Sequence, residues 1–245
     1  MQIIAIANQK GGTGKSTTAA ALAQAAAAQG KKALAVDLDP QGNLSFALNA
    51  DMHRGTSFDL LEGKPAARLI QQSSTGPDII PASLNNSTIS SSRGSAKRLQ
   101  SALLPLKWGY DLIIIDTPPT AGELQYNALQ AATMLIIPMQ AEIYSLQGLY
   151  QIAETAEQIK QSNPALTAAG IVLTRHNERS TIAKQLKESI IDAARQLGIP
   201  YLGAIREAVS IREAQALQRS LFEYAPKSKP ALDYMTLYKK IIPQI

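Results

Sequence analysis

Short apolar runs alternate along the chain with longer segments that have the character of helices. Residues 111–115 (Asp-Leu-Ile-Ile-Ile) are apolar at successive positions, which is typical of a central strand buried on both faces of a parallel sheet. Residues 16–29 are rich in alanine, and Gly30 is placed to end that helix. Strands separated by helices of this length predict βαβ units, with a parallel sheet covered by helices on both faces. The predicted strands are residues 3–7, 32–36, 111–115, 134–138, 170–174 and 201–205, and the predicted helices are residues 16–29, 146–161 and 182–197.

Two stretches interrupt this alternation. Residues 47–74 carry short helical pieces such as Ser57–Leu61, and residues 81–94 are rich in serine and asparagine. We interpret the second stretch as a surface loop that leads into a helix over residues 95–106. Neither looks like a domain boundary, and 245 residues with 45% hydrophobic content suffice for one large α/β domain spanning 1–245.

Composition excludes several classes of protein. No apolar run approaches the roughly 20 residues that span a bilayer, and the start of the chain lacks the pattern of a secretory signal. Cysteine is absent, so disulfides, thiolate metal sites and thiol catalysis are excluded. We therefore expect a cytoplasmic protein.

The net charge of +5 is unevenly distributed along the chain. Residues 1–174 contain 12 Lys/Arg and 12 Asp/Glu, whereas residues 175–245 contain 12 Lys/Arg against 7 Asp/Glu. The excess in the last third fits either an anionic partner or a solvated helical surface, and charge alone does not separate the two.

The clearest chemistry lies directly after the first predicted strand. A strand, a glycine-rich loop, Lys-Ser and a helix are the context of a phosphate-binding P-loop. Glycines allow successive N–H groups to turn inward, Lys15 supplies a charge for the β- and γ-phosphates, and the Ser16 hydroxyl suits Mg²⁺. A glycine-rich turn without a nucleotide is the alternative, which the Lys15-Ser16 pair disfavours. The predicted ATP-binding residues of the loop are Lys10, Gly11, Gly12, Thr13, Gly14, Lys15, Ser16 and Thr17.

The loop departs from the standard P-loop pattern at two positions. Gln9 stands where the pattern has glycine, and a second lysine, Lys10, comes directly before the glycines. The loop backbone already wraps its own phosphates, so Lys10 is better placed to reach the phosphates of a facing subunit. In other phosphoryl-transfer enzymes, a positively charged side chain that a partner supplies in this way, called an arginine finger, raises the reaction rate by about 10³–10⁵-fold.

Carboxylates follow two other predicted strands. Asp37 and Asp39 come after residues 32–36, and Asp116 comes after residues 111–115. The carboxyl ends of parallel strands line the crevice in which ligands bind. Asp116 resembles the Walker B aspartate that orders Mg²⁺, Asp39 is placed to position the attacking water, and Asp37 to support the metal shell. Helix capping is the alternative for Asp37 and Asp39.

Adenine is favoured over guanine as the base. No Asn-Lys-x-Asp guanine reader occurs in the sequence, and Arg175, after the strand that ends at Thr174, could stack on a base. A surface position is equally compatible with Arg175.

These motifs resemble the ParA/Soj/MinD family of deviant Walker ATPases, and more closely its ParA/Soj DNA-partition branch. Their order and spacing match the family from residue 1 to about 150, and more weakly to the end of the chain. The matching segments are residues 8–17 (Asn-Gln-Lys-Gly-Gly-Thr-Gly-Lys-Ser-Thr), 37–43 (Asp-Leu-Asp-Pro-Gln-Gly-Asn), 116–119 (Asp-Thr-Pro-Pro), 127–129 (Asn-Ala-Leu), 138–142 (Pro-Met-Gln-Ala-Glu) and 145–149 (Ser-Leu-Gln-Gly-Leu).

The resemblance implies a three-layer αβα P-loop NTPase fold, with a mostly parallel twisted sheet of about seven or eight strands. It also implies ATP and Mg²⁺ as cofactors, weak intrinsic ATPase activity and an ATP-dependent homodimer with Lys10 reaching across the interface. In the ParA branch that dimer binds DNA without sequence preference, and a ParB-type partner stimulates hydrolysis, so a nucleoid-associated location is expected. The corresponding DNA contacts here are Lys227, Lys229 and, more loosely, Arg219.

The sequence departs from the partition branch at some positions. Arg206 and Glu207, which we predict to bind ATP near the base together with Arg175, stand where that branch often has Pro-Arg-Asn. Gln147 replaces a usual glutamate, and Thr174–Asn177 is closer to MinD. A MinD-like membrane-cycling ATPase is therefore the alternative, although Pro243 would cut a C-terminal amphipathic helix short. A biosynthetic ATPase or metallochaperone on the same fold is a third class, which the absence of cysteine disfavours.

Overall fold

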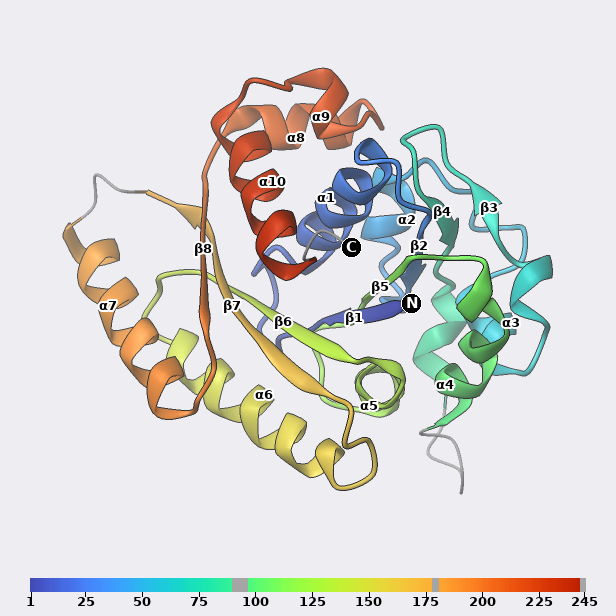
Figure 1. Ribbon diagram of the computed structural model, residues 1–245, viewed down its shortest axis with the longest axis horizontal. Coiled ribbons are helices and arrows are strands. Elements are labelled where there is room, and N and C mark those ends of the chain that lie inside the picture. The colour runs from blue at the N-terminus through green and yellow to red at the C-terminus, as the bar shows by residue number, and fades with distance from the viewer. Residues whose placement is uncertain (90–96, 178–180, 243–245) are drawn as a thin grey trace.

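The centre of the molecule is one sheet. Within residues 1–89, 97–177 and 181–242, which the computed structural model describes, eight strands form this sheet in the order β3-β4-β2-β5-β1-β6-β7-β8 (Figure 1). All neighbouring strands are parallel except β3, which runs antiparallel to β4. The mostly parallel sheet predicted from the sequence is thus confirmed. The strands are β1 (Gln2–Ile6), β2 (Ala33–Asp37), β3 (Gln71–Gln72), β4 (Asp78–Ile80), β5 (Leu112–Asp116), β6 (Met134–Met139), β7 (Thr167–His176) and β8 (Tyr201–Arg206).

Each central strand supplies side chains to two hydrophobic cores, one on each face of the sheet. In β1, Ile3 and Ala5 belong to one core, while Ile4 and Ile6 belong to the other. This alternation follows from the two-residue period of a strand, and it explains why the middle of each central strand is continuously apolar.

Helices cover both faces and complete the three layers (Figure 1). The first core packs against α3, α4, α5, α6 and α7, and the second packs against α1, α2, α8, α9 and α10. The helices of the first layer are α3 (Ser57–Leu61), α4 (Arg98–Leu103), α5 (Glu123–Ala131), α6 (Ser145–Lys160) and α7 (Thr181–Gln196), with the 3₁₀ helices η1 (Ala66–Arg68), η2 (Leu84–Thr88) and η4 (Leu104–Trp108). Those of the second layer are α1 (Lys15–Ala28), α2 (Asn43–Ala47), α8 (Val209–Ala216), α9 (Leu221–Tyr224) and α10 (Lys229–Ile241).

Two segments differ from the sequence prediction. The helix predicted over residues 95–106 is α-helical only as α4, and the chain continues as η4 from Leu104. Pro105 explains the change, because proline lacks the N–H that would continue the α-helical ladder. Part of the predicted 81–94 loop forms η2, which begins at the N-cap Ser83. Residues 90–96 and Pro243 lie outside the described residues.

The two edge strands are short or irregularly paired. β3 contains two residues. β8 pairs with β7 across register shifts, and the Lys240 ammonium donates a hydrogen bond to the Leu202 carbonyl oxygen at 2.8 Å. Because the other strands are parallel, their carboxyl ends meet at one edge of the sheet, and ligand sites of such sheets lie there.

Candidate functional site

A cavity of about 440 Å³ opens at the carboxyl edge of the sheet. The turn after β1, the turn after β2, helix α2 and the ends of β5 and β7 contribute to it, as the parallel arrangement predicts. α8 closes one side. The lining residues are Gly11, Gly12, Thr13, Gly14, Lys15, Ser16, Thr17, Asp39, Asn43, Phe46, Ala47, Pro119, Arg175 and Gln215.

The glycine-rich loop is fixed by bonds to its carbonyl groups. The Thr174 hydroxyl lies 2.8 Å from the Thr13 carbonyl oxygen, and the Gln140 amide donates to the Gly12 carbonyl oxygen at 2.6 Å. Gly14 has a φ of 82°, and a Cβ there would lie 3.3 Å from the Thr174 side chain. Glycine is therefore required at this turn.

The loop delivers the chain into the start of α1 with its N–H groups available. No side chain caps α1, and no acidic residue occupies its first turn. The first N–H groups of a helix have no partner within the helix, and the positive end of the helix dipole attracts anions. The loop and α1 therefore form a backbone cradle suited to phosphate.

Lys15 lies inside this cradle. Its side chain is buried, and its ammonium group donates to the Lys10 carbonyl oxygen at 3.2 Å. Burial lowers the pKa of Lys15, while the negative charges of Asp116 and Asp39 act in the opposite direction. A bound phosphate would supply the further negative charge that favours the ammonium form.

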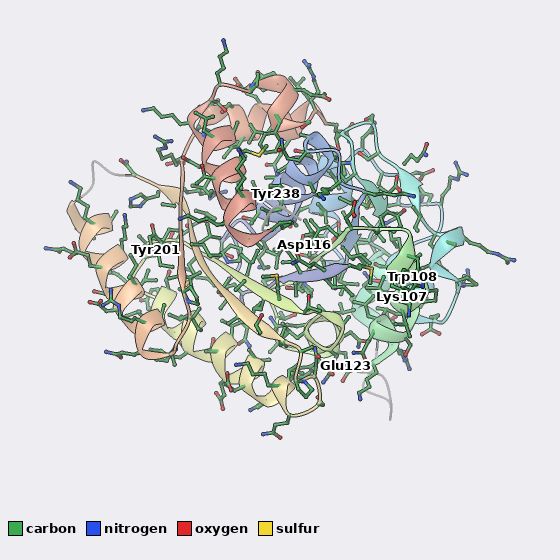
Figure 2. The ribbon with its side chains drawn as sticks, in the orientation of Figure 1. Lys107, Trp108, Asp116, Glu123, Tyr201 and Tyr238 are labelled. Atoms are coloured by element: carbon green, nitrogen blue, oxygen red, sulfur yellow. The ribbon has the colours of Figure 1, made fainter. Side chains whose placement is uncertain are left out.

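Asp116 is the least satisfied polar group of the site. It is fully buried, and among the described residues neither of its carboxylate oxygens has a hydrogen-bond partner. Burial raises the pKa of Asp116 well above its usual value, and the charge of Asp37 raises it further. The Ser16 hydroxyl and Lys15 favour the charged form, although Ser16 lacks the geometry of a hydrogen bond. Figure 2 shows Asp116 near the middle of the molecule.

These groups fit a magnesium ion. A buried carboxylate without a hydrogen-bond partner favours its charged form only beside a cation, and the Ser16 hydroxyl beside it is a second oxygen ligand of the kind that Mg²⁺ prefers. Within the described ranges no three His, Cys, Asp or Glu side chains form a ready metal cage. That agrees with Mg²⁺, which is commonly held by one or two carboxylates together with substrate phosphates.

Asp37 is paired with Asp116 in the register of β2 and β5, but its carboxylate is used differently. One oxygen accepts hydrogen bonds from the Ser45 N–H at 2.8 Å and from the Ser45 hydroxyl at 2.7 Å. The other accepts from the Asp39 N–H at 3.1 Å. Burial raises the pKa of Asp37 to about 7. Because protein donors already engage both oxygens, a role of Asp37 in the metal shell stays a prediction.

Asp39 lines the cavity, and its Oδ1 accepts a hydrogen bond from the Gln41 N–H at 3.0 Å. The bonds to Asp37 and Gln41 fix the turn that carries this carboxylate. The structure thus brings Asp39 to the same cavity as Lys15 and Ser16.

Lys10 has a different environment from Lys15. Its backbone N–H donates to the Asn8 side-chain oxygen at 3.0 Å, while its ammonium group forms an ion pair with Glu142. Glu142 precedes Ile143 and Tyr144, whose side chains are 74% and 73% exposed. The Lys10 side chain therefore lies at a surface that also presents apolar groups, and its action across a subunit interface stays a prediction.

A second cavity of about 110 Å³ adjoins the first and contains the residues predicted to contact the base. Arg175 lines both cavities and has a φ of 49°. The Arg206 guanidinium group forms a two-pronged ion pair with Asp233 of α10, at 2.9 and 2.6 Å. The lining residues are Gly14, Thr17, Thr174, Arg175, Ile205, Arg206, Glu207, Ala208, Ile211, Arg212, Gln215 and Tyr234.

The predicted DNA-binding residues lie outside these cavities or at their margin. Lys227 and Lys229 are exposed around the start of α10, where Ser228 is the N-cap. Arg219 is exposed, and its guanidinium group lies 5.8 Å from the centre of the Tyr224 ring.

Sequence reasoning missed two residues that shape the site. Ser45 holds Asp37, and the Gln215 amide donates to the Thr17 hydroxyl at 3.2 Å, which joins α8 to α1. Ser45 follows the quoted 37–43 motif closely, so its position offered a signal. Gln215 offered none, because α8 was not predicted.

Comparisons with known proteins agree with this geometry. Residues 1–168 match the family model described as an AAA domain. The chromosome-partitioning ATPase Soj of Thermus thermophilus is 35% identical over 99% of this chain and 96% of its own length. None of the helices in the described part of the chain is long and apolar enough to cross a membrane.

Solved structures show the same fold. Cobyrinic acid a,c-diamide synthase from Mycobacterium smegmatis, with bound ATP analog and magnesium, has a TM-score of 0.83 at 31% identity, covering 96% of this chain and 91% of its own. The septum site-determining protein MinD of Pyrococcus horikoshii, complexed with Mg-ADP, has a TM-score of 0.82 at 26% identity, covering 99% and 96%. The chain therefore belongs to the ParA/Soj family of P-loop ATPases, whose fold it shares.

Proposed function

We propose that this protein is a single-domain ATPase that hydrolyses Mg²⁺-bound ATP to partition plasmid or chromosomal DNA. The observation that carries the nucleotide site is the buried Asp116 carboxylate, which has no hydrogen-bond partner in the described structure and lies near Ser16 and Lys15. A triphosphate and its metal supply the charges that this cluster lacks. The partition role rests on the similarity to Soj over nearly the whole chain.

Each group has a distinct task in this proposal. The loop N–H groups and Lys15 bind the phosphates, and Ser16 and Asp116 would hold Mg²⁺, which would neutralise the phosphate charge. Asp39 orients the water that attacks the γ-phosphorus and accepts its proton, as the bond to ADP breaks. Arg175, Arg206 and Glu207 surround the base. Since Arg206 is already paired with Asp233, we expect it to shape the base cavity and not to move into it.

The assembly is part of the same proposal. ATP brings two copies together with Lys10 reaching the partner's phosphates, and the dimer binds DNA without sequence preference through Lys227, Lys229 and Arg219. A ParB-type protein stimulates an intrinsically weak hydrolysis. The protein would then reside in the cytoplasm on the nucleoid.

Calorimetry with Mg²⁺-ATP tests the central claim. Lys15→Ala should abolish binding, because it removes the one lysine within the phosphate cradle. Lys160→Ala is a matched control, since Lys160 pairs with Glu157 on the surface of α6. Unchanged affinity in Lys15→Ala would overturn the nucleotide site.

Two further measurements separate the competing roles. DNA retardation with ATP, ADP or no nucleotide should show retention only with ATP. Flotation with anionic vesicles tests the MinD-like alternative, which would be favoured by recovery with lipid and no binding to duplex DNA.

A further inference from the structure

A pocket separate from the two cavities described above lies at the opposite edge of the sheet, where the central strands begin. We call it the Trp108 pocket, and its volume is about 460 Å³. Its walls come from the residues directly before β1, β2 and β5, from η4 and from the last turn of α10. The side chains that the argument uses are Lys31, Lys32, Lys107, Trp108, Tyr110 and Tyr238.

The pocket combines lysines with aromatic rings. The Lys107 ammonium lies 5.0 Å from the centre of the Trp108 ring, and the Lys32 ammonium lies 5.1 Å from the centre of the Tyr110 ring. The Trp108 side chain is 89% exposed, so most of its ring remains open despite Lys107. Figure 2 labels Lys107 and Trp108 close together in the right-hand half of the view. A tryptophan so exposed beside cations provides a stacking surface within a positive field.

The floor of the pocket is held by bonds among the strand starts. The Gln2 N–H donates to the Asp111 carbonyl oxygen at 3.0 Å, and the Asp111 N–H donates to the Lys32 carbonyl oxygen at 2.9 Å. The Asp111 carboxylate accepts from the Lys32 N–H at 2.8 Å. Three lysines and one aspartate line the described pocket, so the formal charge of its side chains is +2. Such a preformed site favours an anion.

We propose that the Trp108 pocket binds a nucleic-acid strand, with an unpaired base stacked on Trp108 and the adjoining phosphates contacted by Lys31 and Lys107. An exposed aromatic ring beside positive charge is the combination with which proteins bind single strands irrespective of sequence. An anionic lipid surface is the other candidate for a positive site with an exposed tryptophan, and the vesicles in the experiment below distinguish it from a nucleic acid. The site is separate from the nucleotide cavity, which lies at the other edge of the sheet.

The pocket is also distinct from the DNA tract proposed above. Lys229 begins α10, whereas Tyr238 lies nine residues later, a separation of about 14 Å along a helix. The inference does not depend on the ATP-driven dimer and can be tested without nucleotide.

Trp108 itself provides the measurement, because it is the single tryptophan of the chain. Full-length protein carrying Lys227→Glu and Lys229→Glu, without ATP, is titrated with a 12-nucleotide oligothymidylate, with the corresponding duplex and with anionic vesicles. We expect saturable quenching of tryptophan fluorescence by the single strand and a weaker effect of the duplex, whose bases are already stacked. No quenching by the single strand would overturn the proposal, and so would a response confined to vesicles.

Labelled oligothymidylate gives a second measurement by fluorescence anisotropy. Trp108→Ala should weaken binding by roughly 5- to 150-fold, the loss that removal of one base–aromatic stack produces. Lys31→Glu with Lys107→Glu should weaken binding and lower its salt dependence, while the surface variant Lys160→Glu should bind like the parent. Because Trp108 is so exposed, its replacement should leave folding intact. Equal affinity of Trp108→Ala and the parent would overturn the stacking role.

Calorimetry of the same parent protein with Mg²⁺-ATP measures nucleotide binding at the other edge of the sheet. The two measurements therefore show separately whether the nucleotide cavity or the Trp108 pocket fails to bind its ligand.

Discussion

Three aspartates of the site have the same chemistry and different surroundings. Asp116 is buried without a hydrogen-bond partner in the described structure, Asp37 accepts three hydrogen bonds, and Asp39 lies on the cavity wall. Environment therefore assigns their tasks. The uncompensated carboxylate suits a cation, the carboxylate with three hydrogen bonds fixes a loop, and the carboxylate that lines the cavity is placed to accept a proton.

Asp39→Ala should separate binding from chemistry. The loss of the group that positions water should lower the hydrolysis rate by about 10²- to 10⁴-fold, the usual contribution of a general base. ATP affinity should remain, because the phosphate cradle is unchanged. A phosphate-release assay with calorimetry on the same sample measures both. Asp37→Asn provides a comparison, since it disturbs the bonds to Ser45 and should lower stability as well. Normal turnover of Asp39→Ala would remove the assigned role.

The motif residues could be predicted because their spacing and strand context restrict what they can contact. Lys15, Asp39 and Asp116 all reach the carboxyl edge that the strand pattern predicted. The ion pairs of Lys10 with Glu142 and of Arg206 with Asp233 could not be predicted. They join residues distant in sequence, and no local pattern encodes such partners.

At the scale of elements, the irregular pairing of β7 depends on a glycine. β7 pairs with β6 and β8 across register shifts, and Gly170 pairs with Ile136 directly after the shift between β6 and β7. Its φ is 151°, and a Cβ there would clash with the Pro200 carbonyl oxygen and lie 2.7 Å from the Leu202 side chain. Irregular pairing of this kind bends and twists a strand.

Gly170→Ala should therefore destabilise the protein strongly. Backbone strain of about 1–3 kcal/mol and a clash of similar size together predict a loss of roughly 2–6 kcal/mol in the free energy of unfolding. Gly198→Ala is the matched control, since Gly198 has a φ of 68° but open space around it, and should cost about 1–2 kcal/mol. Urea denaturation compares the two variants. Equal losses would show that the crowding at Gly170 has no consequence.

Among the elements that the sequence prediction missed are two short strands with weak local signals and one helix with a clear signal. β3 and β4 contain two and three residues, too few for a periodic pattern to develop. α10 was overlooked although Tyr234, Leu237, Tyr238 and Ile241 form a regular buried stripe. The proline after its first residue is a common helix start and is a second signal for this helix.

For the whole molecule, the family match extends over residues 1–168, whereas much of the second helical layer comes from the last third of the chain. The general architecture followed from alternating strands and helices. The arrangement of α8, α9 and α10 depends on packing against α1, which sequence periodicity does not specify.

Lys10→Ala should retain ATP binding and lose ATP-dependent dimerisation. Its ammonium lies at the surface on Glu142, so its removal leaves the phosphate cradle intact. Light scattering with and without ATP measures the change in mass. The hydrolysis rate should fall by about 10³-fold or more, which is the loss expected when a positively charged finger residue supplied by a partner is removed. Glu142→Gln frees the lysine and should preserve the dimer. A Lys10→Ala protein with normal turnover would contradict action across the interface.

Lys227→Glu with Lys229→Glu should weaken the proposed DNA binding. Loss of two phosphate contacts should reduce the slope of log affinity against log salt by about 2 for duplex DNA. Filter binding over a salt series measures this slope in the presence of ATP. Arg195→Glu is the control, because Arg195 is exposed and paired with Asp192 on α7. An unchanged slope would exclude the two lysines as contacts.

The borders of the sheet restrict how copies of this protein can join. β3 has only two residues, so it offers little backbone for pairing with a further strand. At the other border, β8 is irregularly paired, and its Leu202 carbonyl oxygen already accepts a hydrogen bond from the Lys240 ammonium. Short, twisted or charged borders discourage growth of one sheet into the next. Polymerisation by strand addition is therefore disfavoured, so any assembly of copies should use surfaces other than the two borders of the sheet.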